Sequence, residues 1–224
     1  MVSPWAFESR LVLAQQKVDA KSNEITAIPT LLELLDLEGC IVTIDAMGTQ
    51  KEIAAQIISQ NADYVLALKG NQGRAHEDVK HFFEAKLKNG FREIAVREHE
   101  TTDYGHGRTE VRRYYQVDQI DWLLAKEEWS GLASIGMMQT ERTANGETSR
   151  ETHYYLSSLP AKPRQFAKAV RGHWGIENRL HWQLDIAFNE DGSRIRKDRA
   201  PENLAIVRHI ALNMLQQNKT LKRG

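Results

Sequence analysis

One segment carries most of the side chains that could do chemistry. Residues 170–185 read VRGHWGIENRLHWQLD, in which His173, Glu177 and His181 recur every four residues. On an α-helix this spacing places the three side chains along one face, where imidazole and carboxylate groups could bind one metal ion. Their order differs from the His-Glu-x-x-His motif of zinc proteases. A solvated polar helix face is the alternative interpretation of the same spacing.

Asp45 is a second candidate, because it closes the apolar run that starts at Cys40. A short continuous apolar run predicts a strand that is buried on both faces of a sheet with parallel pairing. Such sheets place functional groups at the C-terminal ends of their strands. A carboxylate there needs a partner, such as a cation or a helix N-terminus. Asp45 is therefore either a ligand, or a cap or loop acid before a helix predicted at 50–61.

The elements that must position these residues alternate between β-prone and helical patterns, which predicts an α/β fold. Ser22 and Asn23 offer an N-cap for the first helix, in which Pro29 must occupy an early turn. The expected elements of this part are a hairpin of Val2–Phe7 and Leu11–Val18, helices over 22–37 and 50–61, and buried strands at 40–46 and Tyr64–Leu68.

A change of pattern near residue 91 predicts a β-rich insertion, followed by helices. Short β-prone runs at 91–98, 109–117, 132–142 and 151–156 are separated by turn signals. Residues 164–187 are then helical in pattern, and Pro201 suits the start of a last helix. Its expected apolar face comprises Leu204, Val207, Ile210, Ala211, Met214 and Leu215.

Composition excludes several classes of protein. Of 224 residues 41% are hydrophobic, and no run approaches the roughly 20 apolar residues that a membrane span needs. The first residues lack the basic start and apolar stretch of a signal peptide, so a cytoplasmic protein is expected. The single cysteine, Cys40, cannot form an internal disulfide, and a small thiol beside an apolar run is interpreted as part of the core.

The net charge of zero conceals two unlike parts. Residues 162–224 hold 13 Lys and Arg against 6 Asp and Glu, a net charge of +7 that is balanced by −7 in the rest of the chain. A basic face next to an acidic remainder is typical of proteins that bind a polyanion. A solvated helix surface would give the same count.

Five spaced segments give the chain a specific resemblance. KSNEITAIP, TIDAMGTQ, ALKGNQG, YGHGRTE and HWGIENRLHWQLD occur in this order, and with them the chain resembles the H-repeat-associated proteins, a branch of the bacterial DDE insertion-sequence transposases. The resemblance implies a ribonuclease-H-like mixed sheet. It also implies a division into a core at 1–90, an insertion at 91–160, and helices at 161–224 that complete the core.

By this resemblance Asp45 matches the second aspartate of the catalytic triad and Glu177 matches the glutamate, and both would bind Mg²⁺ in a two-metal site. The expected partners are DNA, as element ends and target, and a second copy or a full-length relative. Three positions differ from the related pattern on the glutamate helix: His173, Val170 and Leu184 stand where arginine, tyrosine and lysine are common. The expected DNA-binding residues are Lys69, Asn71, Arg171, His173, Trp174, Arg179, His181, Arg194, Arg196 and Lys197.

The strand that carries the first catalytic aspartate in such folds has no counterpart before Val2–Phe7. We therefore expect the first strand to be missing from the sheet, and the chain to be a truncated transposase that is inactive as it stands. Two alternatives remain open at this point: a DNA-binding regulatory remnant without catalysis, and an unrelated metallohydrolase that uses His173, Glu177 and His181.

Overall fold

The computed structural model describes residues 2–18, 24–90, 94–105 and 107–218, without the side chains of Glu177 and Asn178. Two compact units make up the chain. The first joins Met1–Asp36 to Arg171–Gly224, and the second is Leu37–Val170. The boundary at residue 170 falls inside helix α4 (Pro163–Ile176).

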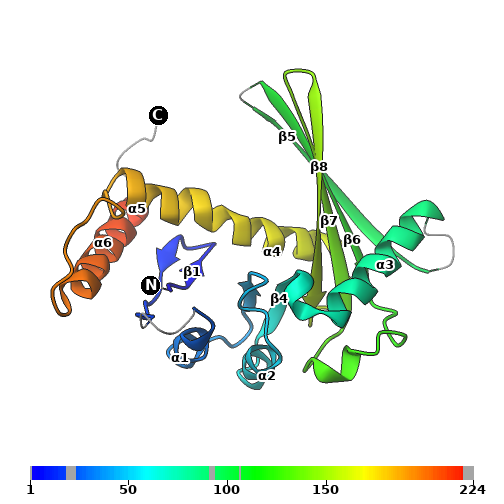
Figure 1. Ribbon diagram of the computed structural model, residues 1–224, viewed down its shortest axis with the longest axis horizontal. Helices are drawn as coiled ribbons and strands as arrows, with labels where there is room; N and C mark the ends of the chain where they lie inside the picture. Colours follow the sequence, from blue (N-terminus) through cyan, green and yellow to red (C-terminus); the bar gives the residue numbers. More distant parts are fainter. Residues whose placement is uncertain (1, 19–23, 91–93, 106, 219–224) are drawn as a thin grey trace. The chain divides into compact units, whose positions relative to one another are not determined.

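A six-stranded mixed sheet forms the second unit, in the order β3-β4-β8-β7-β6-β5 (Figure 1). The first two strands are parallel and every other neighbouring pair is antiparallel. Strands β5 to β8, which arise from the predicted insertion, thus continue the same sheet as β3 and β4. The bounds are β3 Ile41–Ile44, β4 Asp63–Leu68, β5 Arg97–Gly105, β6 Arg108–Val117, β7 Ser134–Ala144 and β8 Glu147–Ser157, with helices α2 Lys51–Ser59 and α3 Arg74–Lys88 and short helices Gly70–Gln72 and Lys126–Glu128.

The start of α4 packs on one face of this sheet through Phe166, which is fully buried. Its ring makes edge-on contacts with the rings of Tyr114 and Tyr155, at centroid distances of 6.2 and 5.3 Å. Gly136 on β7 leaves room for it, because a Cβ atom there would lie 2.4 Å from the Phe166 ring. The bulky aromatic side chain and the missing one opposite therefore fit together.

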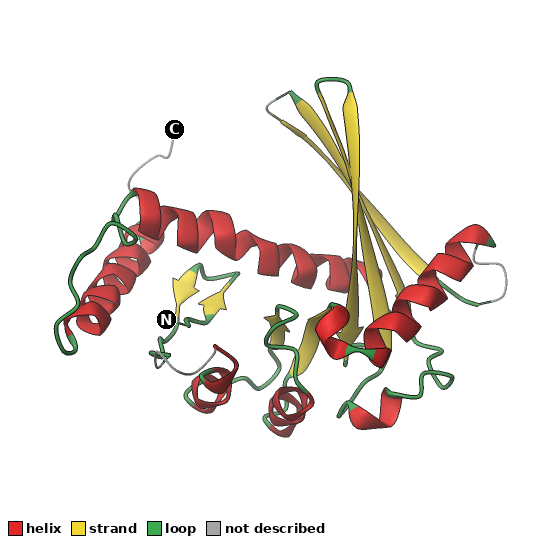
Figure 2. Cartoon of the chain, viewed as in Figure 1, coloured by secondary structure: helices red, strands yellow, loops and turns green. Residues whose placement is uncertain are grey.

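The outer ends of β5 to β8 continue past α3 as a twisted ribbon (Figure 2). Polar side chains dominate both faces there, and cross-strand ion pairs link the strands. Arg113 on β6 contacts Glu100 on β5 at 2.8 Å, and Arg150 on β8 contacts Glu141 on β7 at 2.8 Å. Cross-strand pairs of this kind stabilise a sheet where no helix covers it.

The first unit combines a small hairpin with several helical segments. Its core is a cluster of Val12, Leu180, Leu184 and Leu212, with Trp5, Ile176 and Phe188 packed against it. The elements are β1 Trp5–Ala6, β2 Leu11–Val12, η1 Glu24–Thr26, α1 Ile28–Glu33, the π-helical turn η4 Glu177–His181, α5 Trp182–Ile186 and α6 Ala200–Gln217.

Most of the predicted elements are confirmed. The hairpin forms, although its strands are only Trp5–Ala6 and Leu11–Val12, and β3 and β4 are parallel. Pro29 and Pro201 both stand in the first turn of a helix. The N-cap expected at Ser22 or Asn23 falls outside the described residues, as does the start of the strand expected at 91–98, where β5 begins only at Arg97. Helix α3 was not expected, although Ala75, Val79 and Phe83 recur at helical spacing and are buried.

Two expectations about burial are wrong. Strand β3 is half-buried along its whole length and Cys40 is exposed, because β3 pairs with β4 alone among the described residues and so forms an edge of the sheet. Helix α6 buries Ala205, His209 and Leu212, whereas Val207, Ile210, Met214 and Leu215 of the expected apolar face are more than half exposed.

Candidate functional site

Asp45 lies in the loop directly after β3, at the C-terminal end of the parallel strand pair. Its side chain is exposed, and its Oδ1 accepts a hydrogen bond from the Gly48 backbone N–H at 3.0 Å. It does not cap α2, whose N-cap is Gln50 and has no side-chain cap. The helix-cap interpretation is therefore wrong. One carboxylate oxygen is held by the turn, and the side chain faces solvent at the edge where α/β sheets bind ligands.

The loop after β4 holds the Asp45 loop in place. The side-chain amides of Asn71 and Gln72 both donate to the carbonyl oxygen of Ala46, at 2.7 and 2.6 Å. The Gln72 amide also reaches the Thr49 carbonyl oxygen at 3.2 Å, and its own oxygen accepts from the Lys69 N–H at 2.8 Å. Two of the quoted segments, TIDAMGTQ and ALKGNQG, are thus joined by side-chain amides.

Thr49 holds the same loop by hydrogen bonds in the protein interior, where the residue is only 1% exposed. Its hydroxyl lies 2.9 Å from the Asp45 carbonyl oxygen and 2.8 Å from the Ala67 carbonyl oxygen. A hydroxyl has one proton, so it can donate to one of these carbonyls at a time. The backbone position of Asp45 is consequently fixed against β4 by buried polar contacts that sequence reasoning did not single out.

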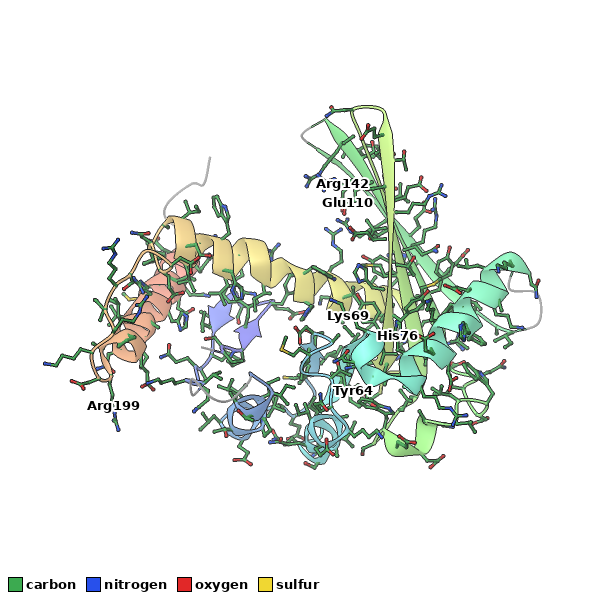
Figure 3. All side chains as sticks on the ribbon, in the orientation of Figure 1. Tyr64, Lys69, His76, Glu110, Arg142 and Arg199 are labelled. Atoms are coloured by element: carbon green, nitrogen blue, oxygen red, sulfur yellow. The ribbon has the colours of Figure 1, made fainter. Side chains whose placement is uncertain are left out.

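Lys69 and Asn71, both expected to bind DNA, follow β4 at this edge, and Figure 3 labels Lys69. Lys69 is exposed at the end of β4. Asn71 is already engaged with Ala46, so its side-chain amide serves the loop. The structure therefore gives Asn71 a structural contact and leaves Lys69 at the surface.

Glu177 begins a π-helical turn, Glu177–His181, between α4 and α5. The expected regular α-helix is wrong at this place, because a π-turn holds more than four residues and shifts the side chains that follow it. Such turns occur frequently at functional sites. His173 is half-buried and His181 is exposed, while the side chain of Glu177 lies outside the described part of the chain.

The ring of Phe7, in the hairpin loop, lies where side chains would otherwise stand at Gly172 and Gly175 in the segment 170–185. A Cβ atom on Gly172 would lie 3.2 Å from the Phe7 ring, and one on Gly175 would lie 3.3 Å from it. The guanidinium carbon of Arg179 stands 5.0 Å from the centroid of this ring, within range of a cation–π contact. Gly172 and Gly175 thus leave room for the Phe7 ring, and the Arg179 guanidinium contacts the same ring.

The other expected DNA-binding residues are distributed over the surface of the first unit. Arg171, Arg194 and Lys197 are exposed, and Trp174 is 48% exposed. The Arg196 guanidinium donates to the carbonyl oxygens of Ser193 and Ile195, at 2.7 and 2.9 Å. Arg199, at the N-cap of α6, also faces outward (Figure 3).

A complete magnesium site is not formed by the described residues. No group of three His, Cys, Asp or Glu side chains there is arranged to hold a metal ion. Asp45 offers one carboxylate, with one oxygen already bonded to Gly48. Asp45 belongs to one unit and Glu177 to the other, so their convergence stays a prediction. Within the described segments, no helix is both long and apolar enough to span a membrane.

Comparison with known families shows to which family the chain belongs. A family model described as "Transposase DDE domain" matches residues 2–214. The chain belongs to this family. Among its relatives are "Putative transposase YncI" of Escherichia coli O157:H7, 43% identical, and "H repeat-associated putative transposase YhhI" of Escherichia coli strain K12, 40% identical, each over the whole of this chain. The expected resemblance to H-repeat-associated proteins is confirmed.

The chain spans 58% to 60% of the length of these two relatives. "Putative protein YbfL" of Escherichia coli strain K12 is likewise 40% identical over the whole chain, which covers 60% of it. The matched region of this DDE chain contains Asp45, Glu177 and the loops that hold Asp45.

Proposed function

We propose that this chain is the larger part of a DNA transposase that cuts phosphodiester bonds with divalent metal ions and joins the released 3′ ends to target DNA. Membership of the transposase DDE domain family supports the reaction class. The observation that carries the assignment to this chain is the position of Asp45, exposed at the C-terminal edge of the parallel pair and fixed by Thr49 and Gln72.

Asp45 and Glu177 are the two carboxylates that we assign to the metal site, with Mg²⁺ as the ion. When bound, two such ions stabilise the attacking and leaving oxygens of the phosphodiester. The role of the chain is to hold the carboxylates: Gly48 and Thr49 orient Asp45, and Glu177 is the first residue of the π-turn. The two units must then bring these residues to one edge, and hard oxygen ligands such as carboxylates are those that Mg²⁺ prefers.

DNA binding is assigned to the basic C-terminal part of the chain. Residues 162–224 carry the net charge of +7, and Arg171, Arg194 and Lys197 are exposed. Cationic side chains at a surface bind phosphates by displacing counter-ions. Lys69 would add a contact with DNA beside Asp45. The side chain of Arg179 is in contact with Phe7, and that of Asn71 is bonded to the Ala46 carbonyl oxygen, so their roles would be to hold these residues in place.

For the fold we propose a ribonuclease-H-like core, at 1–90 and 161–224, with residues 91–160 inserted before the glutamate helix. Strand β3 pairs on one side only among the described residues, and β1 and β2 form a separate two-stranded sheet. A further strand paired with β3 would supply a third carboxylate. With Asp45 and Glu177 alone, the chain Met1–Gly224 is expected not to cut DNA, because two carboxylates position metal ions poorly.

A regulatory protein that binds DNA without cutting is the second candidate. The exposed basic residues at 194–199 support it, because phosphate binding needs no metal site. It differs from the first proposal in one measurable respect, namely that no longer form of the protein would cut DNA.

Cutting of supercoiled plasmid that carries the element ends tests the proposal. The chain Met1–Gly224 and a full-length relative such as YhhI are compared in Mg²⁺. We expect cutting by the relative alone, and its loss when the residue aligned with Asp45 or with Glu177 is changed to alanine. Metal-dependent cutting that survives either change would contradict the site. Salt-dependent binding by both proteins with cutting by neither would favour the regulatory candidate.

A further inference from the structure

A pocket of about 320 Å³ lies inside the first unit, and none of the features discussed above accounts for it. This volume is at the lower end of the range for sites that bind small molecules or single chemical groups. The pocket lies between the π-turn, α5, the loop before α6 and α6 itself. Its lining residues include Ser3, His181, Glu190, Asp191, Arg196, Arg208 and His209.

The floor is apolar with one imidazole in it. Leu180, Leu184 and His209 are only 2%, 4% and 8% exposed. No hydrogen bond to the His209 ring is found among the described residues, and its ring nitrogens are not among the fully enclosed polar atoms that lack a partner, so they remain accessible from the pocket that His209 lines. A ligand that reaches the floor would therefore gain a hydrogen bond that the protein does not supply itself.

Charged side chains near the rim balance one another. Arg208 pairs with Glu190 at 3.6 Å, with side-chain exposures of 12% and 29%. Arg196 and Asp191 are both exposed and add one charge of each sign. The two arginines and the two carboxylates balance in charge, so a proton added to His209 would make the lining net positive.

A positive charge on the His209 imidazole is disfavoured by burial and by the nearby His181. Burial lowers the pKa of His209, and the nearby His181 lowers this pKa further. Without a ligand the buried ring is thus neutral near pH 7. An anion in the pocket would reverse this preference, because it stabilises the protonated form of His209, and the Arg196 guanidinium in the same lining would add a charged donor.

We propose that this pocket binds a phosphate group, with His181, His209 and Arg196 as donors, and that a proton is taken up on binding. A metal ion is a poorer fit, since no group of three possible ligands among the described residues is arranged to hold one. If the phosphate belongs to DNA, the inference rests on the proposed function and adds a proton-linked contact to it. A free phosphate would use the same donors.

The sign of the pH dependence follows from linkage. The pKa of His209 is lowered in the free protein and would be raised by bound phosphate, so binding takes up a proton between these two pKa values. Affinity should then rise as pH falls, by up to about tenfold per pH unit for one proton. The other charged groups that line the pocket with His209 and His181 are Asp191, Glu190, Arg196 and Arg208.

The test follows the histidine ring protons by NMR during titration with inorganic phosphate and, separately, with short duplex DNA. The variants are His209→Gln, His181→Gln and the control His81→Gln, whose ring is 70% exposed on α3 in the other unit. We expect phosphate to raise the pKa of His209 in the wild type. Affinity should fall at least about tenfold in His209→Gln and be unchanged in His81→Gln. If His209→Gln does not fold, His181→Gln and the wild-type titration decide.

Each outcome is informative about the pocket or the proposed function. A response to both ligands supports a DNA phosphate, and a response to inorganic phosphate alone supports a free phosphate. If neither ligand shifts the pKa of His209, the inference is overturned, even when DNA binds elsewhere with steep salt dependence and the proposed function stands. Failure of DNA to bind at any salt would instead remove the proposed function and leave the phosphate titration to decide on the pocket.

Discussion

The Gln72 side-chain amide lies 2.6 Å from the carbonyl oxygen of Ala46, so the loop after β4 fixes the residue next to Asp45. A second bond from the same amide to the Thr49 carbonyl oxygen, at 3.2 Å, ties both ends of the Asp45 turn. One glutamine thus couples the two loops at the C-terminal edge of the parallel strands, where the proposed chemistry takes place.

Replacing Gln72 with alanine should loosen this edge without unfolding the sheet. The loss of its hydrogen bonds should cost about 1–3 kcal/mol of unfolding free energy, measured by chemical denaturation. In a full-length relative the equivalent change should reduce plasmid cutting about tenfold or more, because a misplaced ligand loses transition-state stabilisation. Gln50→Ala is the control, since its amide makes one longer bond, of 3.3 Å, to the Met47 carbonyl. Equal effects of the two changes would contradict the role of Gln72.

Asn213 on α6 should be essential for docking the hairpin in the first unit. Its side chain accepts from the Val12 N–H at 2.9 Å and donates to the Val12 carbonyl oxygen at 2.8 Å, as a neighbouring strand would. Asn213→Ala leaves both backbone groups unpaired and should cost about 2 kcal/mol. Gln217→Ala, which removes one exposed bond to the Ser9 carbonyl, should cost less than about 0.5 kcal/mol. Denaturation curves of the two variants that coincide would refute this.

Gly136→Ala should destabilise the second unit. The new methyl group would stand 2.4 Å from the Phe166 ring, so the ring or the strand must shift, at a cost of about 1–3 kcal/mol. The cost should shrink when Phe166 is changed to leucine, as a double-mutant cycle would show. Gly105→Ala is the matched control, because nothing lies within 4 Å of its added Cβ. Thermal unfolding is measured for the four proteins of the cycle and for the control. A cost of Gly136→Ala that is the same in the Phe166→Leu background would contradict the contact.

DNA affinity should depend steeply on salt if the basic part of the chain follows phosphates. The logarithm of the binding constant should fall with the logarithm of salt concentration by about 0.9 for each neutralised phosphate. Arg194→Glu with Lys197→Glu should weaken binding on every sequence and reduce the slope. The control pair Lys86→Glu with Lys88→Glu, at a half-buried and an exposed position of α3 in the other unit, should do so far less. Affinity that ignores salt, or equal losses in both pairs, would count against the assignment.

Local patterns sufficed where neighbours in sequence decide the structure. The hairpin, the parallel pair and the early-turn positions of Pro29 and Pro201 follow from β-prone runs, apolar runs and the fixed backbone of proline. The start of α1 at Ile28 does not, since the helix was expected over 22–37. The family, and with it the assignment of Asp45 and Glu177, rested on five quoted segments; the family is confirmed, and the roles of the two residues remain proposals.

Contacts between distant residues decided the rest. The face of α6 that is buried contains Ala205, His209 and Leu212, since the bonds from Asn213 to Val12 turn this side toward the hairpin. The apolar count alone favoured the opposite face. The packing of the Phe7 ring against Gly172 and Gly175 likewise joins residues that are far apart in the sequence.

The most direct test of the central claim is to locate the metal ion on the chain itself. Fe²⁺ replaces Mg²⁺ at carboxylate sites and, with ascorbate and peroxide, cleaves the backbone close to where it is bound. If Asp45 and Glu177 form one site, the chain should be cut near both residues, and Asp45→Asn should abolish both cuts together while the control Asp36→Asn abolishes neither. Cuts near one residue only, or cuts near Glu177 that persist in Asp45→Asn, would contradict the shared site.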